Sequence, residues 1–171
     1  MSRPVVAYVD YDPNYPTVFE QTERLVHSAL PGQRLEHIGS TSVPGLGGRG
    51  VLDTAVVAPT GEHPSVVEAL KHVGFSDFPY GAVQPGLAID VALAERAYPV
   101  VLYVVADDHE YLRGWLAFTR YMQAHPEQVE RYSQVKRAAL AEGKTDASAY
   151  QEAKTPYLVE LAQMVEADPR R

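Results

Sequence analysis

The sequence predicts an α+β fold, in which a small mixed β-sheet is covered by helices and followed by a helical C-terminal portion. Short apolar, β-branched runs bounded by glycine and proline occupy the chain up to about residue 106 and are typical of buried strands. Three segments with helical periodicity then occupy about residues 107–168. At 171 residues the chain can bury a proper core as one domain, so we expect a single unit over residues 1–171.

The expected elements follow from local signals. Pro31-Gly32 stops a first helix, Gly74 closes a second, and Asp146 caps the last one. Pro156 lies inside the last helical pattern and predicts a kink or a break. In order, we expect helix Pro13–Leu30, strands Leu35–Ile38 and Val51–Val57, helix Pro64–Val73, a loop with short extended pieces over Phe75–Gly86, strands Leu87–Ala94 and Pro99–Val105 as a hairpin, helix Asp108–Ala124, a helix from Pro126 to Gly143, and a final helix through Val165.

The composition excludes several classes of function. The formal net charge of −7 argues against broad nucleic-acid binding, although a local basic patch remains open. The chain has no cysteine, which excludes disulfides, thiolate catalysis and cysteine-ligated metals. The N-terminus lacks the apolar core of a signal peptide, and no apolar run approaches transmembrane length. We therefore expect a cytoplasmic protein with no membrane association.

A donor-rich loop joins the first two expected strands. Gly39, Ser40, Thr41 and Ser42 directly follow strand Leu35–Ile38, so backbone amides and hydroxyl groups crowd together there. Such a loop favours binding of an anion, and a tight structural turn is the alternative.

Two carboxylates lie inside apolar runs. Asp53 is embedded in the strand Val51–Val57, where a charge is costly unless it is paired or binds a cation. A metal or ligand role and a structural hydrogen bond to the loop amides both remain open. Asp90 lies in the run Leu87–Ala94 and could share a cation with Asp53 if the two strands are neighbours. The alternative is that Asp90 faces solvent on a half-exposed strand.

The run HIGSTSVPGL at His37–Leu46 closely resembles the signature of the GrpB family, whose members have a nucleotidyltransferase-like fold. LAFTRYMQAHP at Leu116–Pro126 is similar to a second segment of that family. Tyr132 with Lys136, and Tyr150 with Lys154, resemble two further family patterns, so the likeness extends from about Tyr11 to Tyr157.

This resemblance implies a nucleotide site. In nucleotidyltransferases of this class a Gly-Ser loop holds the triphosphate, and strand carboxylates in Asp-x-Asp order hold magnesium against the phosphates. Carried onto this chain, Asp53 and Asp90 are the expected catalytic and Mg-binding residues. The expected phosphate- or nucleotide-binding residues are Gly39, Ser40, Thr41, Ser42, Arg49, Lys136 and Lys154.

The sequence departs from the family pattern at the chemical centre. Ala55 stands where the second carboxylate of Asp-x-Asp is usual, and Val101 and Tyr103 stand at two histidine positions. Arg49 replaces a frequent lysine, and Thr119 and Gln123 stand where arginine is common.

Three functional hypotheses follow. The first is a protein that binds a nucleotide or related phosphorylated small molecule, with magnesium-dependent nucleotidyl transfer as its reaction if it is catalytic. The second is a non-catalytic binding module that retains the fold and has lost the second metal-binding carboxylate. The third is a structural partner, such as a homodimer, in which the loop only maintains the fold.

Overall fold

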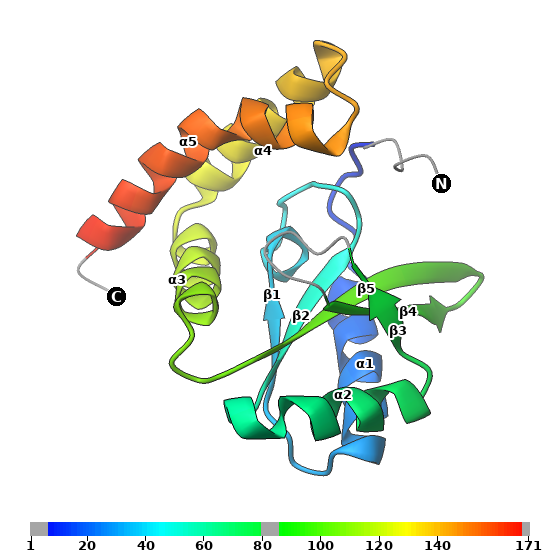
Figure 1. Cartoon of the computed structure of the whole chain (residues 1–171). Helices are drawn as coiled ribbons and strands as arrows, with labels where there is room; N and C mark the ends of the chain where they lie inside the picture. Colours follow the sequence, from blue (N-terminus) through cyan, green and yellow to red (C-terminus); the bar gives the residue numbers. More distant parts are fainter. Residues whose placement is uncertain (1–6, 80–85, 169–171) are drawn as a thin grey trace.

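The structure is a computed structural model that describes residues 7–79 and 86–168. It contains a five-stranded mixed β-sheet flanked by helices, which confirms the α+β prediction (Figure 1). The strand order is β1-β2-β5-β4-β3, with β2 and β5 parallel and every other neighbouring pair antiparallel. The strands are β1 (Leu35–Ile38), β2 (Leu52–Val57), β3 (Ser76–Phe78), β4 (Gly86–Leu93) and β5 (Arg96–Val105).

The helices form a layer on each face of the sheet. Helices α1 and α2 pack on the face that carries Val56 and Leu102, and α3 packs on the opposite face, which carries Ala55 and Val101. Helices α4 and α5 pack against α3 and against each other, beside the sheet (Figure 1). The helices are α1 (Tyr15–Ala29), α2 (His63–His72), α3 (Glu110–Ala124), α4 (Pro126–Ala141) and α5 (Ala147–Ala167), with short 3₁₀ turns η1 (Ser40–Ser42) and η2 (Thr60–Glu62). Among the described residues, no helix combines the length and apolar character that crossing a membrane requires.

Helix α1 begins at Tyr15, two residues later than the sequence predicts. The side chain of Asp12 holds the preceding turn, because its Oδ1 accepts a hydrogen bond from the Asn14 amide at 2.9 Å. Its Oδ2 accepts from the Tyr98 hydroxyl at 2.9 Å and pairs with Arg96 at 2.7 Å. These contacts keep residues 12–14 out of the helix and attach its start to the β4–β5 hairpin.

The sheet is larger than predicted at β5, which begins at Arg96 and not at Pro99. Ser76–Phe78, within the segment expected to be a loop with short extended pieces, forms the edge strand β3. Residues 80–85 of that loop lie outside the described residues. Pro99 is tolerated in β5 because β2 starts opposite Val100, so the lost N–H faces no partner strand at that point.

Pro156 does not break the last helix. Helix α5 is continuous from Ala147 to Ala167 with Pro156 in its interior, so the predicted break is wrong. Buried Tyr150 lies on the N-terminal side of the proline, and buried Tyr157 and Leu161 lie on its C-terminal side. Their packing holds both halves of the helix against the rest of the molecule, which compensates for the missing backbone hydrogen bond.

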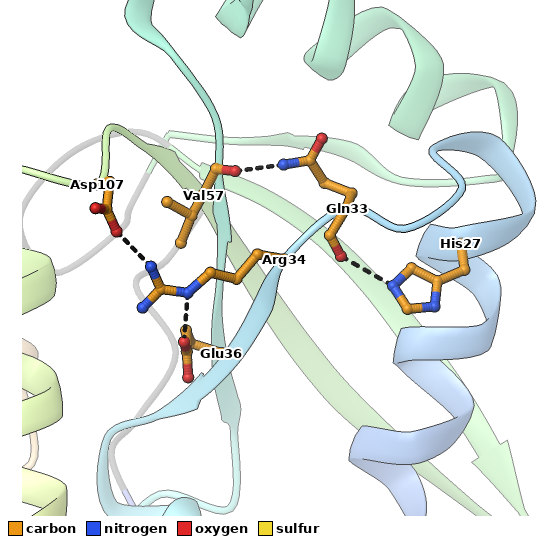
Figure 2. A network of polar contacts seen from close by, with 6 residues as sticks. All are labelled: His27, Gln33, Arg34, Glu36, Val57 and Asp107. Atoms are coloured by element: carbon orange, nitrogen blue, oxygen red, sulfur yellow. Dashed lines mark hydrogen bonds and ion pairs between the residues drawn. The ribbon is translucent and has the colours of Figure 1, made fainter.

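A polar network at one end of the sheet connects four segments of the chain (Figure 2). The His27 ring donates to the Gln33 carbonyl at 2.9 Å, and the Gln33 amide group donates to the Val57 carbonyl. Arg34 donates to Glu36 at 2.7 Å and also pairs with Asp107, which lies in the connection from β5 to α3. The network thereby fixes where the helical portion leaves the sheet.

Candidate anion-binding site

The loop after β1 is shaped by Gly39, which brings it against Asp53. Gly39 has a φ of +72°, in the left-handed region that favours glycine. A Cβ atom on Gly39 would lie only 2.9 Å from Asp53 Oδ2. The glycine therefore allows the η1 turn and the Asp53 carboxylate to lie in direct contact, as the proximity of the two motifs in the sequence suggested.

Thr41 and Ser42 are used to hold the turn in place. Buried Thr41 contacts the His37 ring, with Oγ1 and Nε2 2.9 Å apart. The Ser42 hydroxyl donates to the Gly39 carbonyl at 2.7 Å and lies 3.0 Å from Thr119 Oγ1. Gln123 donates to the Ser42 carbonyl at 3.0 Å. Thr119 and Gln123 thus connect α3 to the turn, where they secure its position.

Ser40 points toward a second glycine loop. A Cβ atom on Gly48 would lie 2.7 Å from Ser40 Oγ and 3.5 Å from Lys136 Nζ. The loop itself is pinned by an isolated β-bridge in which Val9 and Gly48 exchange both backbone hydrogen bonds, at 2.7 and 2.9 Å. Because Gly48 has no side chain, the serine hydroxyl and the lysine ammonium converge on the same small space.

Helices α4 and α5 each contribute one lysine to the site, and each lysine lies over the ring of a tyrosine. Lys136 Nζ lies 4.2 Å from the centre of the Tyr132 ring, and Lys154 Nζ lies 4.5 Å from the centre of the Tyr150 ring. In both pairs the tyrosine precedes the lysine by four residues, which places them on one helical face. Each ring limits where its ammonium group can lie and favours the charged form by a cation–π contact.

Arg49, Lys136 and Lys154 form what we call the cationic cluster. Lys136 is only 3% exposed, and burial lowers its pKa to about 7, helped by the charges of Lys154 and Arg49. Burial and the Arg49 charge lower the pKa of Lys154 to about 8, while Asp53 opposes that change. Arg49 is exposed and lies at the edge of the cluster. Across the described residues, no carboxylate lies within ion-pair distance of these three side chains.

Asp53 is the acid associated with the cluster. Burial raises its pKa to about 6, and the positive charges of Arg49 and Lys154 limit that rise. Lys136 donates to the Gly47 carbonyl at 2.5 Å instead of to a carboxylate. The arrangement therefore places three cations against one acid, which is the charge balance of a site for anions.

Asp90 does not join Asp53. Strand β5 lies between the strands that carry the two acids, so their backbones are about 10 Å apart across the sheet. Asp90 pairs with Pro99, whereas the residue in the row of Asp53 is Ala88, and Asp90 is exposed. The condition under which the two acids could share a cation, adjacent strands, is not met.

The residues around Asp53 do not fit a protein-held magnesium ion. No cluster of three or more His, Asp or Glu side chains suited to a metal occurs in the part of the chain that the structure describes. The neighbour of Asp53 at i+2 is Ala55, which packs with Val101 and Tyr103 in one apolar cluster on the same face. Magnesium as a cofactor stays a prediction from the family resemblance.

The sequence did not identify two residues of this site, Gly48 and Tyr8. Gly48 is one, and the adjacent glycine pair Gly47-Gly48 is a usable signal of close backbone approach. Tyr8 is the other: its hydroxyl is buried against Gly47 without a hydrogen-bond partner among the described residues. A lone aromatic residue near the N-terminus gave no signal for that position.

A separate cavity of about 770 Å³ lies between α3 and α5 and contains none of the predicted site residues.

Comparisons with known proteins agree on one family. A family model described as GrpB protein matches residues 5–164. A UPF0157 protein of Halalkalibacterium halodurans is 25% identical over 95% of this chain and 83% of its own length. A UPF0157 protein of Pseudomonas aeruginosa is 28% identical over 81% of this chain, and the match spans only 59% of that relative.

Solved structures show the same fold at low sequence identity. The crystal structure of GrpB from Enterococcus faecalis superposes with a TM-score of 0.72 at 20% identity, over 93% of this chain and 96% of that one. A structure of the Cid1 poly(U) polymerase gives a TM-score of 0.50 at 14% identity, over 87% of this chain and 49% of the polymerase. The fold is therefore nucleotidyltransferase-like.

Proposed function

Because the chain belongs to the GrpB family and has a nucleotidyltransferase-like fold, we propose that it binds a nucleotide or related phosphorylated small molecule at the cationic cluster. Ser40, Gly48 and Lys136 would contact a phosphate group, and Arg49 and Lys154 would balance its charge. The Cid1 poly(U) polymerase structure, which has Mg 3′-dATP bound, is consistent with a nucleotide as the ligand class.

The observation that carries this proposal is the excess of positive charge in a partly buried place. Lys136 is buried beside two other cations, which is unfavourable for the unliganded protein because like charges repel and a buried ammonium loses its hydration. A phosphate group would relieve both costs through charge-assisted hydrogen bonds. The buried Tyr8 hydroxyl beside Gly47, which has no hydrogen-bond partner among the described residues, would supply a further donor.

A non-catalytic role is favoured over nucleotidyl transfer. Ala55, Val101 and Tyr103 are apolar beside Asp53, and Glu36, the carboxylate opposite Ala55 on β1, is paired with Arg34. Neither group supplies a free second carboxylate to help orient a metal–phosphate complex. Incubation with α-phosphate-labelled nucleotides should therefore transfer no label to hydroxyl or phosphate acceptors. Transfer that depends on Asp53 would restore the catalytic alternative.

Thermal unfolding in the presence of ATP, GTP, CTP or UTP tests the binding. A ligand at about one hundred times its Kd adds roughly 2.7 kcal/mol to stability. For a chain of this size we expect Tm to rise by about 5–11 °C. No rise with any of the four nucleotides would contradict the proposal.

Gly48→Ala locates the site. The new methyl group would lie 2.7 Å from Ser40 Oγ and would fill the space shared with Lys136, so the rise in Tm on adding nucleotide should be lost. Gly61→Ala is the matched control, because a Cβ atom there has no neighbour within 4 Å, and it should respond to nucleotide like the unmodified protein. Equal responses from both variants would place the ligand elsewhere.

A further inference from the structure

We propose that the cationic cluster binds phosphate that carries no divalent cation, with Lys154 and Arg49 serving as the counter-charges of Asp53. The inference rests on the proposed function and specifies its ligand as an unchelated phosphate or polyphosphate group. It runs against the magnesium dependence that the fold family implies, and the surroundings of Asp53 carry it.

The cluster around Asp53 carries an excess of positive charge. The carboxylate lies against Gly39 on one side and within electrostatic reach of Lys154 and Arg49. With Lys136 included, three cations and one acid meet, so the cluster is already positive before any ligand binds. A divalent cation would add two further positive charges at a place where positive charge is in excess, which Coulomb repulsion opposes.

In the described part of the chain, Asp53 lacks the free neighbouring carboxylate ligands that a magnesium ion would need. Magnesium takes near-octahedral oxygen coordination and is commonly held by one or two carboxylates together with substrate phosphates. Here the i+2 residue on β2 is Ala55. Opposite it, Tyr103 on β5 belongs to an apolar cluster, and Glu36 on β1 is already paired with Arg34 at 2.7 Å. Asp90 lies two strands away and is exposed. Among the described residues, Asp53 would therefore be the carboxylate of this group that no ion pair engages, and Lys154 and Arg49 lie within its electrostatic reach.

Lys136 and Ser40 are placed to contact the phosphate directly. Lys136 Nζ and Ser40 Oγ converge on Gly48, and the Tyr132 ring keeps the ammonium over that space. These are direct donors to phosphate oxygens, and they need no metal to mediate the contact. Phosphate oxygens occupied by magnesium would be unavailable to them. Magnesium should therefore compete with the protein for a chelating ligand.

Inorganic tripolyphosphate and inorganic phosphate are the probes, because the first chelates magnesium strongly and the second weakly. With EDTA present, we expect both probes to raise Tm, and tripolyphosphate to bind more tightly in calorimetry. Magnesium in excess over tripolyphosphate should weaken its apparent affinity, whereas the affinity for inorganic phosphate should change little.

The outcomes separate the two proposals. Binding in EDTA supports both. Binding that appears only when magnesium is added would keep the proposed function and overturn this inference. The absence of any effect of either probe, with or without magnesium, would reject the two together.

Asp53→Asn gives an independent measurement. Removing the single negative charge from the cluster should tighten tripolyphosphate binding in EDTA, on the order of tenfold. If Asp53 held a metal, the same substitution would instead abolish binding that is measured with magnesium present. Asp90→Asn is the matched control: it removes an equal charge from an exposed position two strands away and should leave the affinity unchanged. An equal tightening in both variants would show that the total charge, and not the position of Asp53, sets the affinity.

Discussion

At the scale of single residues, Gly39 and Gly32 share a positive φ and have different surroundings. Both have a φ of +72°. A Cβ atom on Gly39 would lie 2.9 Å from Asp53 Oδ2, whereas a Cβ atom on Gly32 would have no neighbour within 4 Å. Alanine is therefore strained by the positive φ at both positions, and at Gly39 it would also displace Asp53.

Alanine substitution at the two positions should show this difference. Gly32→Ala should lower the free energy of unfolding by about 1–2 kcal/mol, the cost of a left-handed conformation for a residue with a Cβ atom. Gly39→Ala should lower it by about 1–3 kcal/mol more, because the methyl group forces Asp53 to move. Urea denaturation of both variants measures the difference. Equal losses would mean that the loop and Asp53 do not depend on their contact.

At the scale of the elements, the two helix prolines differ in their positions. Pro126 begins α4, where its missing N–H would have no intrahelical partner, and Pro156 lies inside α5. Both side chains are exposed, so replacing either removes little packing.

Pro156→Ala should stabilise the protein by about 1–3 kcal/mol, because an interior proline costs a helix about 3 kcal/mol and part of the gain is offset by the freer unfolded chain. Calorimetry should show a higher Tm. Pro126→Ala should change Tm little, since that proline is compatible with the first helical turn. A lower Tm for Pro156→Ala would show that the proline shapes α5 for its packing on α4.

The elements also show which signals in the sequence are sufficient. Asp146 caps α5 as predicted, because its side chain accepts hydrogen bonds from the amides of Ser148 and Ala149, each at 3.0 Å. Such a cap is a local interaction and can be predicted from neighbouring residues. The start of β5 could not be, because tolerance of Pro99 depends on where β2 begins, and that register is set by long-range pairing. Pro156 is misleading for the same reason, since tertiary packing outweighs its local preference.

At the scale of the whole molecule, a site for anions lies in an acidic protein. The chain carries a formal net charge of −7, whereas the cationic cluster has three cations against one acid. The local field near Lys136 is set by Arg49, Lys154 and the Tyr132 ring, which lie on a loop and on two helices. Ligand binding should therefore depend on the protonation of the cluster more than on the total charge.

Sulfate is a suitable probe of that dependence, because its charge is constant above acidic pH. The bound dianion favours the charged lysines and raises their pKa values from about 7 for Lys136 and about 8 for Lys154. Binding above pH 7 then takes up protons, so affinity should fall as pH rises, by at most about tenfold per pH unit for each proton taken up.

Calorimetry in buffers of different ionisation enthalpy measures that uptake. Lys136→Arg keeps its charge throughout the range, so the variant should take up less proton than the unmodified protein. Affinity for sulfate that is constant between pH 7 and pH 9 would exclude titration of these lysines on binding.

The site was predictable in part. The resemblance supplied Ser40, Lys136 and Lys154, and the structure brings these residues into one region with Asp53. The sequence alone could not show that β5 separates Asp90 from Asp53, because strand order is not encoded in local patterns. Nor could it show that Thr41 and Ser42 are used to hold the turn, since a hydroxyl looks the same whether it binds a ligand or a neighbour.

Lys136 and Lys154 lie on α4 and α5, which follow the whole sheet in the sequence, so they are made after it during synthesis. All five strands are complete at Val105, and Lys154 follows about 50 residues later. At ribosomal rates that interval lasts roughly 2–10 seconds. All residues of the sheet, Asp53 among them, are therefore made before Lys154. A ligand that needs both lysines can act only on chains that have been translated through Lys154.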